Sequence, residues 1–283
     1  MPTAKLSDIT GKADSKPLQL GAPANEPKSE KEAQKETDVR DPERRVTGTA
    51  DIPLNSAGRK QSIALAKRCK GFFDKVYTSS MGRAKSTAEM IDSKAEVEHA
   101  LDPFKLAEHE GKPVSSERVA INERVKNRPD EVAPGRSSIS GKRGESFNQF
   151  ADRGIEWAEK LREECDEDPE LKILNVTHGR NMRLINAWAM AGFPNDRTVD
   201  TEEMTRDGDD WSMPGDLFRL DAKELKKVDG KPTEPGLYYA RHGSTEYSQG
   251  EPTEQASRSG GEKPAPSTPN EKEVLQPAEQ APK

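Results

Sequence analysis

Two histidines and two arginines in this sequence follow short apolar segments that are typical of buried strands. Arg241 and His242 follow LYYA, His178 follows ILNVT, and Arg83 comes shortly after KVYTSS. Guanidinium groups bind phosphate oxygens through paired hydrogen bonds, and a neutral imidazole is a good nucleophile near neutral pH. These residue types suit phosphoryl transfer, in which one histidine attacks phosphorus while the other cationic groups hold the transferring group.

A glycine stands directly after each of these histidines. Gly243 follows His242, and Gly179 follows His178. Because glycine has no side chain, each position lets the backbone approach phosphate oxygens closely. The helix predicted to begin at Gly179 adds a favourable N-terminal dipole. We therefore expect both glycines to line an anion-binding site; Arg45 is a further candidate for that site, with a surface salt bridge as its alternative role.

Predicted strands and helices alternate along the central part of the chain. The segments KVYTSS, ILNVT and LYYAR favour strands, and GDLFRLD with ELKKV favours a hairpin. Helices are predicted from Asn55, through GRAKSTAEMIDS, over Glu145–Cys165 and over Gly179–Ala191, whereas the stretch from Glu98 to Gly144 is rich in loops. The first of these helices would have Ile63, Ala66, Cys69 and Phe73 on one face. This alternation predicts an α/β fold, a three-layer α/β/α sandwich with a mostly parallel central sheet. The carboxyl ends of its strands would then gather the histidines and arginines at one edge.

The overall composition is too polar for a chain that folds along its whole length. Only 31% of the 283 residues are hydrophobic. Residues 1–40 and 251–283 are rich in Lys, Glu, Pro and Ala and lack apolar periodicity, so we predict disordered tails there. The folded domain is predicted to span residues 41–250, and the tails are candidates for tethering a protein partner.

Charge, apolar runs and cysteines exclude several classes of protein. A net charge of -6 argues against general affinity for nucleic acid or an anionic membrane. No apolar run approaches the roughly 20 residues that span a bilayer, and no signal segment is visible, so we expect a cytoplasmic protein. Cys69 and Cys165 are too few for a disulfide scaffold or zinc motif, and His99 and His109 lack metal-ligand spacing. We therefore expect neither a metal nor another cofactor.

Five segments together resemble the histidine phosphatase superfamily, which has the phosphoglycerate-mutase-like fold. A lone Arg-His-Gly occurs easily by chance, but five segments in a consistent internal order are specific. The resemblance covers nearly all of residues 45–249. It is carried by Arg241–Gly243 with Thr245, RVTGTADIPLNSAGRKQS, VYTSSMGRAKSTAEMI, GESFNQFADR and LNVTHGRNMRL.

The order of these segments matches the family only if the last segment, which contains Arg241–Gly243, is moved to the front. The nucleophile strand, predicted over residues 237–243, opens the domain in the family but comes last here. The segment VDGKPTEPG would then join the family's usual termini. This order predicts a circular permutation, which is physically plausible where natural ends lie close together and new ends fall in surface loops. We expect the last strand to insert in the middle of the sheet.

The resemblance also implies residue roles. By that resemblance, His242 becomes a phosphohistidine, while Arg241, Arg83 and His178 bind and stabilise the phosphoryl group. Two positions depart from the family: Ser248 stands where Asn is frequent, and Pro103 stands where the acidic Glu that protonates the leaving group is expected.

Two nearby carboxylates could replace the missing acid. Asp102 is adjacent to Pro103, and Glu108 lies in the same predicted loop. Either could protonate the leaving group, and we favour Asp102.

A metal-independent phosphatase that acts through a phosphohistidine is the function that these observations favour. A mutase is less favoured, because the stretch before Gly144 is short for the larger mutase lid. The missing acid and the long tails favour an alternative, a catalytically weak or inactive phosphate-binding or scaffold protein. The substrate stays open between a phosphorylated small molecule and a phosphoprotein.

Overall fold

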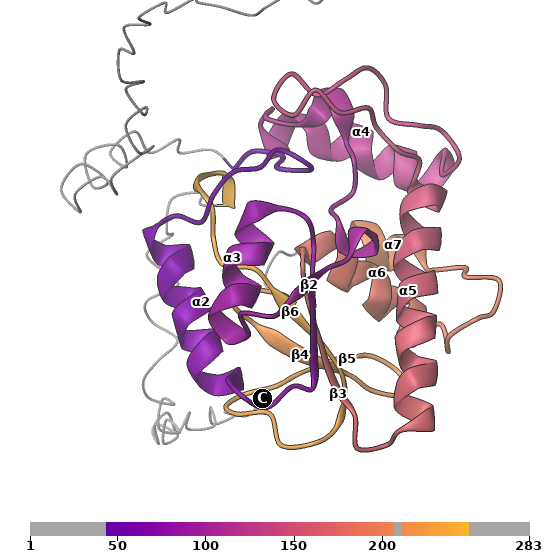
Figure 1. Cartoon of the computed structure of the whole chain (residues 1–283). Coiled ribbons are helices and arrows are strands. Elements are labelled where there is room, and N and C mark those ends of the chain that lie inside the picture. The colour runs from indigo at the N-terminus through magenta and orange to yellow at the C-terminus, as the bar shows by residue number, and fades with distance from the viewer. Residues whose placement is uncertain (1–43, 207–210, 249–283) are drawn as a thin grey trace, which may run out of the picture. The chain divides into compact units, whose positions relative to one another are not determined.

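The computed structural model describes residues 44–206 and 211–248 (Figure 1). The predicted tails, residues 1–40 and 251–283, lie outside these described residues. The described part contains a six-stranded sheet in the order β2-β1-β3-β6-β4-β5. Its strands are β1 (Lys75–Thr78), β2 (Glu96–Val97), β3 (Lys172–Thr177), β4 (Leu217–Leu220), β5 (Leu225–Lys227) and β6 (Gly236–Arg241).

The sheet is mixed but mostly parallel, which confirms the predicted α/β class. Strands β2, β1, β3 and β6 run parallel to one another, whereas β4 is antiparallel to β6 and β5 is antiparallel to β4. The last strand in sequence, β6, lies between β3 and β4, as expected. It pairs with β3 from Gly236 to Arg241 and with β4 from Tyr238 to Ala240.

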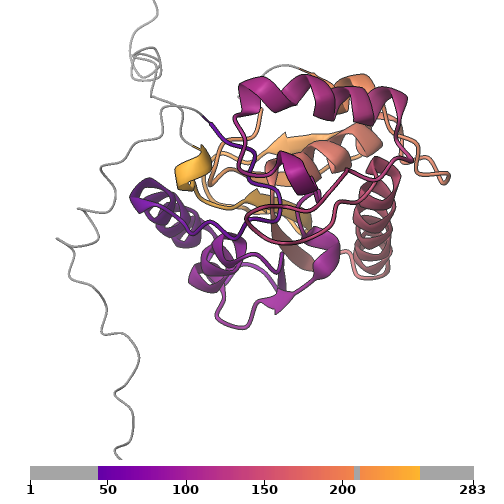
Figure 2. The same cartoon turned by 90° about the horizontal axis from the view of Figure 1, so that it is seen from above.

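Helices cover both faces of this sheet (Figures 1 and 2). Along β3, Ile173 packs in the cluster of α5 and α6, whereas the next residue, Leu174, packs in the cluster of α2 and α3. Tyr239 and Tyr238 of β6 divide between the same two clusters. This alternation is the expected pattern for a strand that is buried on both faces. The helices are α2 (Ser56–Cys69), α3 (Gly82–Ile91), α4 (Val114–Asn127), α5 (Phe147–Glu167), α6 (Gly179–Met190) and α7 (Thr201–Thr205).

Local capping explains where the best-predicted helices begin. The Asn55 side chain accepts a hydrogen bond from the Gly58 N–H at the start of α2. A reciprocal capping box between Ser146 and Gln149 starts α5. The predicted apolar face of α2 is partly confirmed, because Ala66 and Cys69 are buried. Ile63 was wrongly placed on that face: 46% of it is exposed, whereas Leu65 is buried beside Ala66 and Cys69.

The stretch predicted to be rich in loops contains a helix, α4, that the sequence did not reveal. Only Ile121 and Val125 of α4 are buried, and Val119 is 77% exposed. Two buried positions give too weak a period to identify a helix from the sequence. Among the described residues, no helix is long and apolar enough to cross a membrane.

Candidate active site

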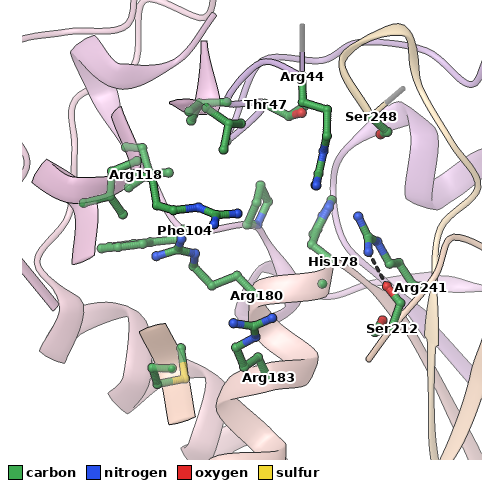
Figure 3. Close-up of a pocket in the computed structure, with 18 of the residues that line it drawn as sticks. Arg44, Thr47, Phe104, Arg118, His178, Arg180, Arg183, Ser212, Arg241 and Ser248 are labelled. Carbon is green, nitrogen blue, oxygen red and sulfur yellow. Dashed lines mark hydrogen bonds between the residues drawn. The ribbon is translucent and has the colours of Figure 1, made fainter. Parts of the chain in front are cut away.

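A cavity of about 250 Å³ lies where strands β3 and β6 end, and its wall includes both predicted histidines and both predicted arginines. His178 follows β3 directly, and Arg241 ends β6. Figure 3 shows the His178 and Arg241 side chains together with other arginines around this cavity. The parallel strands thus gather the four side chains at one sheet edge, as expected from their positions in the sequence.

Arg83 forms hydrogen bonds with both histidines and with two backbone carbonyl groups. Its Nε donates to Nε2 of His242 at 3.3 Å, and its Nη2 lies 3.3 Å from Nδ1 of His178. Its Nη1 donates to the Ala50 carbonyl at 2.7 Å, and Nη2 also donates to the Gly48 carbonyl at 2.9 Å. Burial lowers the pKa of Arg83 to about 10, so the group is still a cation at neutral pH. Arg83 is therefore a fixed positive charge between the two imidazoles.

The tautomer of His242 follows from its backbone contact. Nδ1 lies 2.6 Å from the Gly243 carbonyl oxygen, which only accepts hydrogen bonds, so Nδ1 carries the hydrogen. The lone pair then belongs to Nε2, on the side of Arg83. Burial, followed by the charges of Arg83 and Arg241, lowers the pKa of His242 well below its ordinary value. His242 is thus a neutral imidazole with its lone pair on Nε2, where it accepts from Arg83, and an unprotonated nitrogen is the form a nucleophile requires.

His178 has the opposite tautomer. Arg83 can only donate, so Nδ1 of His178 accepts and Nε2 carries the hydrogen. Nε2 lies 2.9 Å from the Ser79 Oγ, which in turn donates to Asp102 Oδ1 at 3.0 Å. Burial, followed by the charge of Arg83, lowers the pKa of His178 well below its ordinary value. The two imidazole rings lie 4.9 Å apart, centre to centre, so both face the same small volume beside Arg83.

Neither predicted proton donor is on the cavity wall. The Asp102 carboxylate accepts from the Ser79 hydroxyl, from the Ser80 N–H at 2.7 Å and from Nδ1 of His99 at 3.1 Å. Burial raises the pKa of Asp102, but the hydrogen bonds from His99, Ser80 and Ser79 together lower it below its ordinary value. An ionised carboxylate with these partners supports the Ser79–His178 chain. Pro103, the next residue, does line the cavity.

The other predicted acid, Glu108, is exposed and lies beside Gly135. A different carboxylate, that of Glu110, is buried close to the site. It accepts from the Thr49 N–H at 2.7 Å and from the Thr49 hydroxyl at 2.8 Å. Glu110 therefore holds the loop whose Gly48 carbonyl binds Arg83. This role of Glu110 was not predictable from the sequence, because it depends on a contact between residues 61 positions apart.

The predicted glycines differ in what they do. Gly179 lines the cavity, and a Cβ there would lie 3.3 Å from the Cζ of Arg241. Gly243 is not among the lining residues; a Cβ on it would lie only 2.3 Å from the Gly58 carbonyl oxygen. The backbone approach that Gly243 permits is therefore toward α2.

Two further predicted or family-related positions lie on the cavity wall. Arg45 lines the cavity and donates to the Gly111 carbonyl at 2.8 Å. Ser248, which stands where the family frequently has Asn, also lines it, and its Oγ lies 2.9 Å from the Thr245 Oγ1.

Arginine dominates the rest of the wall, which the sequence analysis did not anticipate. Eight arginines line the cavity, and in the described part of the chain no aspartate or glutamate does. Within residues 44–206 and 211–248, no group of three or more His, Cys, Asp or Glu side chains is arranged to hold a metal ion. The arginines suit the binding of anions, and the imidazoles suit nucleophilic attack. The arginines that the sequence analysis missed are Arg44, Arg118, Arg180, Arg183 and Arg206.

Comparisons with known proteins agree with this chemistry. The model of the histidine phosphatase superfamily (branch 1) matches residues 36–203, and the chain belongs to that family. It is 27% identical to the uncharacterized phosphatase PhoE of Bacillus subtilis over 154 residues, which cover 54% of this chain and 72% of PhoE. It is 31% identical to a metal-independent phosphoserine phosphatase of Arabidopsis thaliana over 150 residues, which cover 50% of this chain and 60% of the plant protein.

Solved structures with similar folds include the alpha-ribazole phosphatase of Shigella flexneri. It is 19% identical, the match covers 68% of this chain and 90% of that one, and the TM-score is 0.44. TTHB049 of Thermus thermophilus is 18% identical, with coverage of 66% and 90% and a TM-score of 0.44. The family assignment rests on the sequence match, which defines the chain as a phosphatase of the histidine phosphatase superfamily.

Proposed function

We propose that the protein hydrolyses phosphomonoesters through a phosphohistidine on His242. The Nε2 lone pair of His242 attacks phosphorus, the bond from phosphorus to the ester oxygen breaks, and the alcohol leaves with a proton taken from solvent water. A water molecule then attacks phosphorus in the phosphohistidine and gives a proton back to solvent, which releases inorganic phosphate and restores the neutral imidazole. Arg83 and Arg241 stabilise the charge on the equatorial oxygens, and His178, whose Nδ1 accepts from Arg83, orients that guanidinium toward the transferring group. The observation that carries this proposal is the neutral Nε2 of His242 beside the buried Arg83 cation.

We assign Asp102 a positioning role in this mechanism. Its ionised carboxylate accepts from Ser79, which holds His178 in the tautomer that directs Nδ1 toward Arg83. The donation of a proton to the leaving group by Asp102 or Glu108 stays a prediction, and a comparison of leaving groups tests it.

The phosphoenzyme provides the direct test of the nucleophile. The protein is mixed with a ³²P-labelled aryl phosphate and quenched in alkali, in which phosphohistidine survives. We expect label on the wild type and none on His242→Ala, with aryl phosphate hydrolysis reduced at least a hundredfold. Hydrolysis by His242→Ala at the wild-type rate would overturn the mechanism. Far-UV circular dichroism of the variant provides the control for folding.

We further propose that the chain is a circularly permuted member of its family. The matched range, residues 36–203, ends before β6, although β6 occupies the middle of the sheet. The backbone N–H of Arg45 donates to the Tyr247 carbonyl at 3.2 Å, and Leu54 forms a bridge with Thr245. The two ends of the described domain are therefore neighbours, as a permutation requires.

Reconnection of the chain tests the permutation. A short glycine-serine linker would join residue 248 to residue 44, and new ends would be opened between β5 and β6. We expect this chain to fold and to keep kcat/KM for an aryl phosphate within about fivefold, because every described contact is retained. The matched control has the same linker but its new ends lie inside α6, and we expect it not to fold. Failure of both rejoined chains to fold would contradict the permuted order.

A phosphate-binding protein with little turnover is the second candidate. It is favoured by Pro103, which lines the cavity where the resemblance predicts an acidic residue. Phosphate binding by the wild type without a labelled phosphoenzyme would support it. In this second candidate the tails would attach the protein to a partner.

The relatives' names make phosphoserine and ribazole phosphate reasonable first substrates to test. A cytoplasmic location is a separate prediction and applies to both candidates.

A further inference from the structure

We propose that Arg153 is a positioning residue for the reacting centre. Its guanidinium holds the backbone on both sides of Asp102, and the Asp102 carboxylate then fixes Ser79 and, through it, the imidazole of His178. The inference rests on the proposed function and assigns to that reaction a residue outside the cavity wall.

Three backbone carbonyl groups in residues 100–105, the segment that carries Asp102, accept hydrogen bonds from Arg153. Nη1 donates to the Ala100 carbonyl at 2.7 Å and to the Asp102 carbonyl at 2.9 Å, and Nη2 donates to the Pro103 carbonyl at 3.1 Å. The planar guanidinium group presents its donors in one fixed arrangement. A single side chain therefore fixes the backbone before and after the Asp102 Cα, and with it the direction in which the carboxylate points.

A buried carboxylate, that of Glu145, orients the Arg153 guanidinium. Oε1 of Glu145 accepts from Nη2 at 2.7 Å, and Oε2 accepts from Nε at 3.2 Å, so the ion pair is bidentate. The Glu145 side chain is 7% exposed and the Arg153 side chain 20%, so the pair is better ordered than one at the surface. Oε1 also accepts from the Lys105 N–H at 3.0 Å, which holds the end of residues 100–105. Both partners belong to GESFNQFADR, a segment that has no other part in the proposed mechanism.

Two residues close to His178 hold the same segment from the sheet. Thr177, at the end of β3, donates through Oγ1 to the Leu101 carbonyl at 2.8 Å. Asn181, in the first turn of α6, donates through Nδ2 to the Asp102 carbonyl at 2.9 Å. Both side chains are buried. The backbone of Asp102 and the backbone of His178 are therefore held together, and the guanidinium from α5 adds a third anchor.

The Ser79 hydroxyl transmits this positioning to His178. It has one hydrogen, which it donates to Asp102 Oδ1 at 3.0 Å, so its oxygen is left to accept from Nε2 of His178 at 2.9 Å. Nε2 therefore carries the imidazole hydrogen, and Nδ1 accepts from Arg83 at 3.3 Å. If Asp102 moves away, the Ser79 hydrogen can turn toward Nε2, and the imidazole hydrogen then moves to Nδ1. That form of His178 would present a donor to the Arg83 guanidinium, which can only donate, and would no longer orient it.

The neighbouring part of the cavity wall has its own support. Phe104 lines the cavity (Figure 3), and its ring lies 4.9 Å from the Phe150 ring of α5, centre to centre. This contact consists of apolar ring surfaces and does not use the hydrogen bonds of Arg153. Loss of those hydrogen bonds should therefore disturb the reacting centre more than the binding of substrate, and should lower kcat more than it raises KM.

A charge-conserving variant tests the role of Arg153 in the full-length protein. Lysine keeps a positive charge beside Glu145 but lacks the planar set of donors. In Arg153→Lys we expect kcat for an aryl phosphate to fall about tenfold, with KM within about twofold. The matched control is Arg162→Lys, another half-buried arginine of α5, whose guanidinium lies 3.7 Å from the centre of the Phe193 ring. Both constants should stay within about twofold in the control. An unchanged kcat in a folded Arg153→Lys would overturn the proposal.

The tautomer of His178 distinguishes positioning from a general loss of stability. Long-range ¹⁵N–¹H NMR, which needs no turnover, should show the hydrogen on Nε2 in the wild type and a larger share on Nδ1 in Arg153→Lys. A residue that only stabilises the fold would lower the urea midpoint and leave the tautomer unchanged, and that result would overturn the proposal. Glu145→Gln removes the ionic partner but keeps Arg153, and it should shift the tautomer in the same direction. If Arg153→Lys does not fold, an unchanged tautomer in Glu145→Gln decides against the proposal.

A double variant tests whether Arg153 acts through Asp102. Asp102→Asn and Arg153→Lys should each lower kcat, and the double variant should lose no more than about twofold beyond Asp102→Asn alone. A further loss of about tenfold would show that the two residues act separately and would overturn the proposed route.

The NMR measurement also separates this inference from the proposed function. A tautomer change in Arg153→Lys, together with no phosphoenzyme in the wild type, would retain the positioning of His178 and reject the catalytic proposal. An unchanged tautomer together with a labelled phosphoenzyme would reject the positioning role alone.

Discussion

At the scale of single residues, the two cavity histidines are kept neutral by their surroundings. Burial is the largest cause, followed by the nearby guanidinium charge of Arg83, and together they lower the pKa of His178 and of His242 well below about 6.5. Arg83 thus has two effects on His242. It disfavours the protonated imidazole, which could not attack, and in the proposed mechanism it stabilises the phosphoryl group that the neutral imidazole attacks.

This neutrality predicts an unusual pH profile. A neutral nucleophile is required, and lowered pKa values extend the neutral range toward acid. We therefore expect no loss of single-turnover rate through ionisation of His242 as the pH falls through about 6.5, after correction for substrate ionisation. Long-range ¹⁵N–¹H NMR should show both rings still neutral at that pH, with the urea-unfolded protein as reference. Titration of the two rings near 6.5 would contradict the prediction.

Asp102 provides a second test at the residue scale. If it acts by positioning His178 through Ser79, Asp102→Asn should lower kcat about tenfold, and equally for alkyl and aryl phosphates. A proton donor would give a different result, because a poor alkyl leaving group depends on the acid and an aryl group does not. A loss confined to alkyl phosphates would restore the sequence-based assignment of Asp102 as the acid.

At the scale of elements, the sequence predicts what depends on local pattern. Strands β1, β3 and β6 and helices α5 and α6 follow from apolar runs and periods, and the order of chain segments predicted the central place of β6. Helix α4 was missed because only Ile121 and Val125 face the core. Arg118, which α4 carries to the cavity, was missed with it. The shared cavity of Arg83, His178, Arg241 and His242 was predictable, because parallel strands end at one edge.

What the sequence could not provide is contact at long range. Ser79 donates a hydrogen bond to Asp102, and Glu110 packs against Gly48. Both contacts depend on where the side chains point in the folded chain, and the spacing of residues along the sequence does not contain this information. Gly243 shows the same limit. From the sequence, we expected Gly243 to bring the backbone close to phosphate oxygens, whereas its near neighbour is the Gly58 backbone.

The contact between α2 and the loop after β6 gives a prediction at this scale. A Cβ at Gly243 would lie 2.3 Å from the Gly58 carbonyl oxygen, so Gly243→Ala must displace one backbone segment. We expect the free energy of unfolding in urea to fall by about 1–3 kcal/mol. Gly179→Ala, whose Cβ would meet a side chain at 3.3 Å, is the control and should lose less. Equal stability of Gly243→Ala and the wild type would contradict this account.

At the scale of the whole molecule, β6 is essential to the sheet. Leu237, Tyr238 and Tyr239 are buried, and burial of three large side chains contributes about 5–9 kcal/mol, comparable to the net stability of a typical domain. We therefore expect a chain of residues 1–236 to lack cooperative urea unfolding, whereas a chain of residues 1–248 should retain it. A stable, cooperatively folding 1–236 chain would contradict the role of β6.

The same two histidines make stability depend on pH. Because their folded-state pKa values are lowered, the unfolded chain binds more protons below about 6.5 than the folded chain does. Their contribution to the free energy of unfolding is therefore fully present above about pH 6.5 and declines as the pH falls below it. Urea unfolding from pH 8 to pH 5 measures this decline. His178→Asn should make the decline shallower, and an unchanged slope would contradict the assignment.

The position of β6 also determines the order of events during synthesis. The ribosome completes β3 and β4 well before β6, so the nascent sheet has an unfilled gap beside β3. An unpaired strand edge invites association with other chains, which makes this interval the one in which chaperones are most useful. The proposed nucleophile is the residue directly after β6. The chain therefore gains its complete sheet and the proposed nucleophile almost together.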